Sequence, residues 1–135
     1  MRKVKFVTNQ YYHLFNRGVD KRVIFLDQSD MDRFFQSMEE FNVIEPIGSI
    51  YENFFRKNQL KKQGFESPKE KLVNFICHCL NPNHYHFILE QLIDGGIEKF
   101  MHRLGLGYTK YFNQKYKRSG SLFQGTFKAD RKSVV

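Results

Sequence analysis

Two strand-like segments joined by a three-residue turn dominate the middle of the chain. The first spans Leu72–Leu80 and has the composition of a mostly buried strand, and the second spans His84–Glu90. Asn81-Pro82-Asn83 separates them, and these residue types favour turns. The pattern therefore predicts an antiparallel hairpin over residues 72–90, and the rest of the chain has to fold around it.

Each side of this hairpin carries one strand-like and one helix-like segment. Residues 11–18 predict a strand that ends at Gly18, and residues 31–41 repeat apolar side chains at the spacing of one buried helix face. Residues 27–30 offer N-cap side chains for this helix, which we expect to end near Glu45-Pro46 because a residue before proline resists the helical conformation. Residues 23–26 either extend the sheet or pack over it.

The order of elements after the hairpin completes the fold class. Residues 97–117 predict a long basic helix, and Leu122–Lys128 predicts a last strand. Strand, helix, hairpin, helix and strand together predict an α+β fold of the ferredoxin-like split β-α-β type, with an antiparallel sheet and two main helices on one face.

A chain of 135 residues fits a single domain, 1–135. Residues 47–71 are rich in charge and predict a polar insertion, with a helical piece around residues 50–56. Cys77 and Cys79 are too few for a disulfide framework, and we expect both thiols to be free and buried. No apolar run approaches a membrane span, and the basic N-terminus lacks a signal sequence, which predicts a cytoplasmic protein.

The positive charge of the chain lies in its last quarter. Residues 1–98 hold 13 Lys and Arg against 13 Asp and Glu, whereas residues 99–135 hold 9 against Asp130 alone. Cations that pair with phosphates are interleaved there with aromatic rings on which bases stack. This pattern favours a nucleic-acid partner, and a solvated helix face is the alternative interpretation.

His84 and His86 are the residues with the clearest chemical meaning. Side chains at i and i+2 of a strand point to the same face, so the two imidazoles lie side by side and are able to hold a divalent cation with positions left for a phosphate. Two ordinary histidines on a half-exposed strand are the alternative. A zinc site that adds Cys77, His78 and Cys79 has the wrong spacing, because one residue separates the cysteines where two to four are needed.

Four segments in this order resemble one family of proteins. They are Tyr12-His13-Leu14-Phe15-Asn16-Arg17-Gly18, the stretch from Phe25 to Asp30-Met31-Asp32-Arg33-Phe34, Cys79-Leu80-Asn81-Pro82-Asn83-His84-Tyr85-His86, and Gly120-Ser121-Leu122-Phe123-Gln124-Gly125-Thr126-Phe127-Lys128. The set resembles the HUH tyrosine transposases of the insertion-sequence 200/605 type, and especially their REP-associated branch. The resemblance covers about residues 11–129 and is looser over residues 47–71.

This resemblance implies a homodimer that acts on single-stranded DNA hairpins. It implies Mg²⁺ or Mn²⁺ at His84 and His86, and a tyrosine that attacks the scissile phosphate to form a 5′-phosphotyrosine link, which is later resealed. In the family the nucleophile and a third metal ligand lie on a helix after the strand that matches Leu122–Lys128. That helix is missing here, so we expect a chain truncated before its nucleophile.

Three tyrosines on the basic helix, Tyr111, Tyr108 and Tyr116, are the fallback nucleophiles, although each is more simply a core or base-stacking ring. The expected DNA contacts are Asn16, Arg17, Arg103, Lys110, Lys115, Lys117, Arg118 and Lys128. His13 is expected to be a packed strand residue and not a third metal ligand. Three functions stay open: a metal-dependent DNA transesterase, an inactive relative that binds DNA hairpins, and an RNA-binding module.

Overall fold

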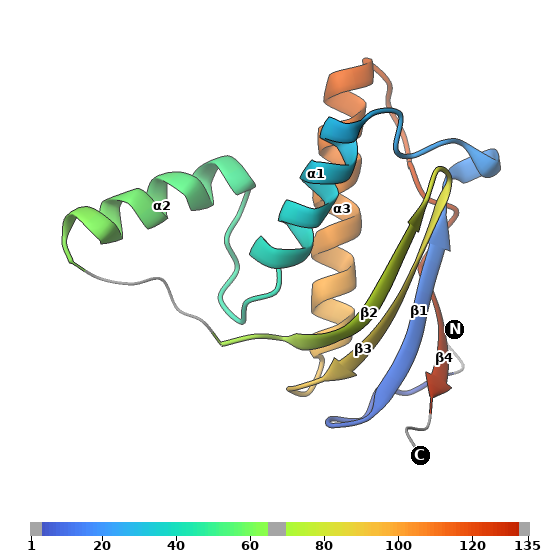
Figure 1. Cartoon of the computed structure of the whole chain (residues 1–135), viewed down its shortest axis with the longest axis horizontal. Coiled ribbons are helices and arrows are strands. Elements are labelled where there is room, and N and C mark those ends of the chain that lie inside the picture. Colours follow the sequence, from blue (N-terminus) through green and yellow to red (C-terminus); the bar gives the residue numbers. More distant parts are fainter. Residues whose placement is uncertain (1–3, 65–69, 133–135) are drawn as a thin grey trace.

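The computed structural model describes residues 4–64 and 70–132, which form one sheet and three α-helices (Figure 1). In chain order the elements are β1 (Tyr11–Arg17), the short 3-10 turn η1 (Val19–Lys21), α1 (Gln28–Glu40), α2 (Ile50–Lys62), β2 (Val73–Asn81), β3 (His84–Gln91), α3 (Gly96–Tyr116) and β4 (Lys128–Lys132). The strand order is β2-β3-β1-β4, and all neighbours are antiparallel. This confirms the predicted α+β fold of the ferredoxin-like split type.

The sheet has one face packed against α1 and α3 and another face that these helices leave open (Figure 1). Tyr85, Phe87 and Leu89 of β3 are almost fully buried on the helix side. Because side chains alternate along a strand, His84 and His86 point to the open face, where they are half-buried.

Aromatic rings fill the layer between the sheet and the two helices. Phe34 of α1 meets Tyr108 of α3 edge to face, with ring centroids 5.0 Å apart, and Tyr85 of β3 at 5.3 Å. Gly107 of α3 allows the end of α1 to pack closely against this helix. A Cβ atom at position 107 would lie only 2.6 Å from Cζ of Phe41, the residue that directly follows α1. Gly107 in mid-helix is therefore explained by close packing of a ring against the α3 backbone.

Helix α1 ends at Glu40, earlier than the predicted end near Glu45-Pro46. The buried carboxamide of Asn42 explains this, because its Nδ2 donates to the Val73 carbonyl at 2.9 Å and its Oδ1 accepts from the Leu72 and Val73 amides at 3.1 and 3.0 Å. These bonds fix the chain after α1 to the start of β2 and leave no room for a further helical turn.

The last strand lies later in the chain than Leu122–Lys128, so that prediction was wrong. Residues 122–127 are irregular, with a single bridge between Gly18 and Phe123, and the strand is β4 at Lys128–Lys132. Gly125 has a φ value of +68°, which an extended strand does not accommodate. Leu122 and Phe123 are nevertheless buried, so this stretch is apolar because it packs against the core.

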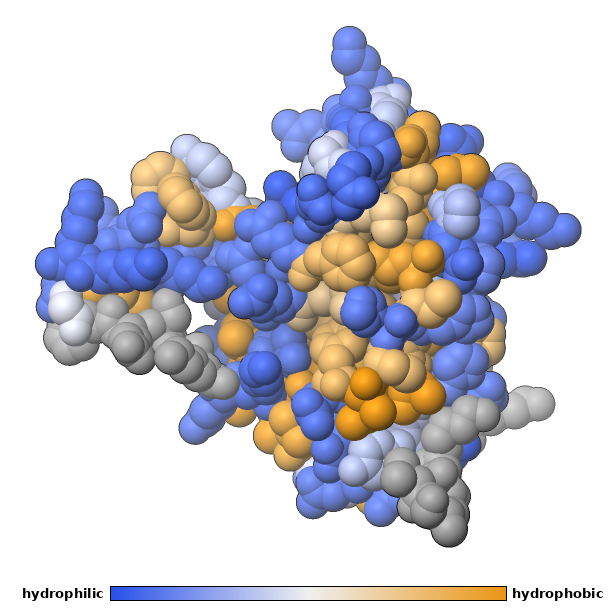
Figure 2. All heavy atoms as spheres, viewed as in Figure 1, coloured by the Kyte–Doolittle hydropathy of each residue, from blue (hydrophilic) through white to orange (hydrophobic). Residues whose placement is uncertain are grey.

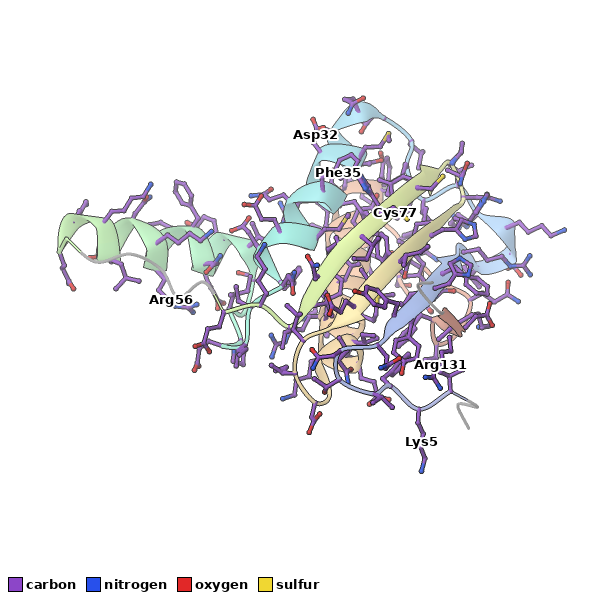
Figure 3. All side chains as sticks on the ribbon, turned by 60° about the horizontal axis from the view of Figure 1, so that its bottom comes forward. Lys5, Asp32, Phe35, Arg56, Cys77 and Arg131 are labelled. Atoms are coloured by element: carbon purple, nitrogen blue, oxygen red, sulfur yellow. The ribbon has the colours of Figure 1, made fainter. Side chains whose placement is uncertain are left out.

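Strand β2 is an outer strand whose second half is largely exposed, in contrast to the predicted buried strand (Figure 3). An irregularity between Phe75 and Cys77 shifts the register, so that Cys77 pairs with Ile88 and Cys79 with His86. The shift turns both cysteines to the open face, and both are exposed. The expectation of buried thiols was therefore wrong, although both cysteines are free.

Residues 47–71 contain a full helix, and the predicted piece at residues 50–56 is only its first half. Helix α2 begins at the Ser49 side chain, which accepts from the Glu52 amide at 3.0 Å, and it projects away from the rest of the molecule (Figures 1 and 2). Asn53 ties it to the body by donating to Glu40 Oε1 at 2.9 Å. Residues 65–69 of this segment lie outside the described residues.

Within the described residues, no helix combines the length and the apolar character needed to cross a bilayer.

Candidate functional site

His84 and His86 occupy the start of β3, directly after the turn that the sequence predicts. The Pro82 carbonyl accepts from the amides of Ile24 and Phe25 at 2.8 and 3.2 Å, so residues 23–26 pack over this end of the sheet. The Asn83 carbonyl accepts from the Gly18 amide at 2.9 Å. These bonds hold the turn, and with it the first residue of β3, in a fixed place.

The two rings lie next to each other on the open face. Their centroids are 5.1 Å apart and the ring planes are perpendicular. Nδ1 of His84 is 2.8 Å from Oδ1 of Asn83, and an amide oxygen only accepts, so this nitrogen carries the hydrogen. Nε2 of His84 then keeps its lone pair, as a metal ligand must.

His86 is in contact with a third imidazole. Its Nδ1 lies 2.9 Å from Nε2 of His13, which comes from the neighbouring strand β1. Burial lowers the pKa of His86, and the neighbouring His13 and His84 lower it further. These surroundings favour the neutral ring, in which one nitrogen has a lone pair for an electrophile.

A cavity of about 530 Å³ opens beside the histidine pair. Its lining residues are Phe15, Asn16, Arg17, Lys21, Asn83, His84, His86, Gln124 and Lys128. Phe15 faces His86 across the β1–β3 ladder with the two ring planes 25° apart, and Arg17 faces His84. The cavity combines two imidazoles, three cations and an aromatic ring. That set is suited to a phosphate with an attached base.

The side chains of this cavity come from segments far apart in the sequence. Nε of Arg17 donates to Oε1 of Gln124 at 2.7 Å, and Nζ of Lys128 donates to the Thr126 carbonyl at 2.7 Å. Asn16 is buried, and its Nδ2 donates to the Gly125 carbonyl at 3.2 Å. Arg17 and Lys128, two of the eight predicted DNA contacts, thus lie with the histidine pair, and buried Asn16 borders the same cavity.

The other predicted DNA contacts belong to α3 and the turn after it, away from the histidine cavity. Arg103 donates to the Val43 carbonyl at 2.8 Å, and Arg118 donates to Oδ1 of Asn113 at 2.6 Å. Lys117 caps α3 in a left-handed conformation, and Lys110 lines a separate groove with Arg33. The structure does not bring these cations together with His84 and His86.

Lys115 is engaged in a cluster with two carboxylates. Its Nζ lies 2.8 Å from Oδ1 of Asp30 and 2.9 Å from Oδ2 of Asp27. Hydrogen bonds from Lys115 and Ser29 lower the pKa of Asp27 to about 2. Burial alone would raise the pKa of Asp30, but its bonds to Lys115 and Tyr116 outweigh burial and lower it. The cluster explains Lys115 as a residue that stabilises the fold.

The three fallback tyrosines take part in the same packing. The hydroxyls of Tyr111 and Tyr116 donate to Asp30 at 2.8 and 2.6 Å, and that of Tyr108 donates to the Ile24 carbonyl at 2.5 Å. Burial raises the pKa of all three, and the Asp30 carboxylate raises it further. Tyr108 is fully buried on the helix side of the sheet, whereas the histidines are on the open side. The structure therefore does not place these tyrosines beside the histidine pair.

The sequence predicts His13 as a packed strand residue but not its contact with His86, and it predicts no role for Tyr11 or Lys21. His13 contacts His86, and Tyr11 follows the same alternation along β1, which puts it on the open face as well. The signal was present, since residues 11, 13 and 15 of a strand share a face. Lys21 lines the cavity although it lies in η1, where the sequence offers only a polar turn.

The similarity of this chain to known proteins lies in its fold. Neither protein-family models nor curated proteins give a match. Among solved structures, a REP-associated tyrosine transposase bound to a REP hairpin superposes with a TM-score of 0.54 at 8% identity, over 100% of this chain. A protein from Deinococcus radiodurans R1 assigned as a transposase gives 0.57 at 13% identity, over 98% of this chain and 87% of that one.

The chain has a transposase-like fold. It spans 63% of the length of the hairpin-bound transposase. At these identities the likeness concerns the path of the backbone, and the chemistry has to be argued from the side chains of this chain.

The residues present fit a divalent cation as a two-ligand site. The described residues contain no group of three or more His, Cys, Asp or Glu side chains arranged to hold a metal. Each imidazole of the pair has one nitrogen engaged at the back and one available, and the cavity leaves space for phosphate oxygens and water as further ligands.

Proposed function

We propose that this chain is a transposase-family protein that binds single-stranded DNA hairpins through the open face of its sheet. The cavity beside His84 and His86 carries this proposal, because it joins a metal-competent pair to the cations Arg17, Lys21 and Lys128. The transposase-like fold supports it, and one of the similar structures holds a REP hairpin. A DNA substrate also agrees with a cytoplasmic location, and the resemblance to the family adds a homodimer to the proposal.

In this proposal the lining residues divide the work of binding a nucleotide. Arg17, Lys21 and Lys128 neutralise phosphates and set the path of the backbone. Phe15, half-buried beside His86, offers a ring on which an unpaired base stacks. His84 and His86 would hold Mg²⁺ or Mn²⁺ through Nε2, and such an ion polarises a phosphate oxygen when it is bound.

Strand transfer additionally needs a nucleophile. A tyrosine oxygen would form a bond to phosphorus, the bond to the 3′ oxygen would break, and the proton lost by the tyrosine would end on the released 3′ hydroxyl. Among the residues that the structure describes, no tyrosine lines the cavity. Tyr108, Tyr111 and Tyr116 are held on the helix side by bonds to Ile24 and Asp30. We therefore propose that the chain by itself binds hairpins without becoming covalently attached to them.

Binding is tested with a pool of labelled single-stranded DNA hairpins, read out by fluorescence anisotropy at several salt concentrations. Arg17→Ala and Lys128→Ala should each weaken binding and lower the slope of log K against log salt by about 0.7 to 0.9, the value of one phosphate contact. Lys62→Ala removes the same charge from the exposed end of α2 and is the matched control. Equal effects of all three variants, or preferential binding of an RNA hairpin pool, would contradict the proposed interface.

Covalent attachment is tested on the same samples with Mn²⁺ by intact mass spectrometry. We expect no adduct. A metal-dependent adduct that disappears in His84→Ala would show that the chain does supply a nucleophile, and peptide mapping would then identify the tyrosine.

A further inference from the structure

Three polar side chains form a row across the open face, one from each of three neighbouring strands. His86 of β3 contacts His13 of β1, with Nδ1 and Nε2 2.9 Å apart and the ring planes 9° from parallel. His13 pairs directly with Asp130 of β4 in the strand register, and its Nδ1 lies 3.6 Å from Oδ2 of that residue. The metal-competent histidine is therefore the first member of a row that ends at a carboxylate.

One arrangement of the hydrogens suits both contacts of this row. In it Nδ1 of His13 carries a hydrogen toward a carboxylate oxygen of Asp130, which accepts. In this tautomer Nε2 of His13 has a lone pair, and it accepts the Nδ1 hydrogen of His86. Nε2 of His86 is left with its lone pair. His84 reaches the same state independently through Asn83, so both histidines offer the same nitrogen to a ligand.

The two contacts differ in strength. The side chain of His13 is 22% exposed, and its bond to His86 has normal hydrogen-bond length. Asp130 is 62% exposed, and 3.6 Å is longer than a hydrogen bond, so solvent weakens its influence. We expect His13 to control the orientation of His86, with Asp130 as a weaker support.

We propose that His13 is a positioning residue for the cation site: it accepts the Nδ1 hydrogen of His86 and so holds Nε2 of that ring ready to bind a divalent cation. The inference rests on the proposed function, because it concerns the same pair of histidines. It also gives His13 a role distinct from that of a ligand, since its Nε2 is occupied by the bond to His86.

Two substitutions separate the hydrogen bond from the packing. His13→Phe keeps a ring that stacks between Phe15 and His86 but removes the acceptor, and His13→Gln keeps an acceptor without the ring. His102→Phe, at an exposed position of α3, is the matched control. Thermal unfolding followed by circular dichroism verifies that each variant is folded.

The first measurement is Mn²⁺ affinity without DNA, from the loss of the free-ion signal in electron paramagnetic resonance. We expect His13→Phe to bind 10- to 100-fold more weakly, as for other partners of metal-bound histidines, and His13→Gln to stay within about threefold of the unmodified protein. Equal affinities of the Phe variant and the unmodified protein would overturn the role of His13. Pulsed measurements that count three coupled imidazoles on Mn²⁺ would also overturn it, because His13 would then be a ligand.

The second measurement needs no metal and separates failure of this inference from failure of the proposed function. In protein labelled with ¹⁵N at histidine, long-range NMR correlations report which ring nitrogen carries the hydrogen. We expect the hydrogen of His86 on Nδ1 in the unmodified protein and an equilibrium of both forms in His13→Phe. If the unmodified protein binds no Mn²⁺ but shows this change, the cation site is wrong and the positioning contact is right. A hydrogen on Nε2 of His86 would refute the contact itself.

Discussion

Gly105 and Gly107 lie in the same helix, α3, but we expect their replacement by alanine to change the free energy of unfolding in opposite directions. A Cβ atom added at Gly105 meets no heavy atom within 4 Å, whereas one added at Gly107 would lie 2.6 and 2.7 Å from two ring carbons of Phe41. Phe41 is 6% exposed, so its ring has little space to move away from the added atom. Both positions are within α3, where alanine is favoured over glycine by about 0.8 to 1.0 kcal/mol.

The two variants should therefore separate clearly. Gly105→Ala gains the helical preference alone and should stabilise the protein by about 1 kcal/mol. Gly107→Ala gains the same amount but forces the ring of Phe41 to shift, and overpacking of this kind costs about 1 to 3 kcal/mol. The difference between the variants is then about 1 to 3 kcal/mol. Urea unfolding followed by circular dichroism would show it as a shift in midpoint of about 1 M for 2 kcal/mol.

The reasoning depends on Phe41, which allows a direct check. In a Phe41→Leu background the ring carbons are gone, so the penalty at Gly107 should largely disappear while the effect at Gly105 stays the same. If Gly107→Ala is as stabilising as Gly105→Ala, or if its effect is unchanged by Phe41→Leu, the packing argument is refuted.

Three further predictions concern charges and thiols. Asp30→Ala should lower the free energy of unfolding by about 3 kcal/mol, because the buried carboxylate accepts hydrogen bonds from Tyr111 and Tyr116. The control Asp32→Ala, at an exposed position, should change it by less than about 0.5 kcal/mol in the same urea assay. The pKa of the Asp27 carboxyl is lowered from 3.8 to about 2, so its contribution to stability is present above pH 4 and is lost as the pH falls toward 2. Thermal unfolding scans across this pH range should therefore show a smaller loss of stability in Lys115→Met than in the unmodified protein. Cys77 and Cys79 should both react rapidly with a thiol reagent in the folded protein, since both are exposed, and slow reaction that requires urea would contradict their position.

The sequence was sufficient for the elements that depend on local patterns. The turn at Asn81-Pro82-Asn83 and the spacing of His84 and His86 are local, and they predict a hairpin with two imidazoles on one face. The helical repeat in residues 31–41 likewise places Phe34 and Met38 in the core. Helix ends were less accurate, because α1 ends where Asn42 bonds to residues some 30 positions later.

Other features depended on contacts between distant segments. The irregularity between Phe75 and Cys77 reverses which side chains of β2 face the helices, and a shift of one residue leaves little trace in composition. Similarly, Lys115 looks like a nucleic-acid contact in a basic helix, but its partners Asp27 and Asp30 precede it by more than 80 residues. The contact of His13 with His86 could not be predicted, because it depends on the register of β1 against β3.

The cations of the chain therefore serve two different purposes, and the sheet separates them. Lys115 and Arg103 of α3 neutralise carboxylates or cap carbonyls on the helix side, so the excess charge of the last quarter contributes to the fold itself. The cations beside the histidines come from β1, η1 and the first residue of β4. Because β1 lies between β3 and β4, these segments meet on one face although they are more than 100 residues apart. A DNA interface at this face thus depends on strand order, and disrupting the β1–β4 pairing would separate Lys128 from the histidines while the charge of the chain stayed the same.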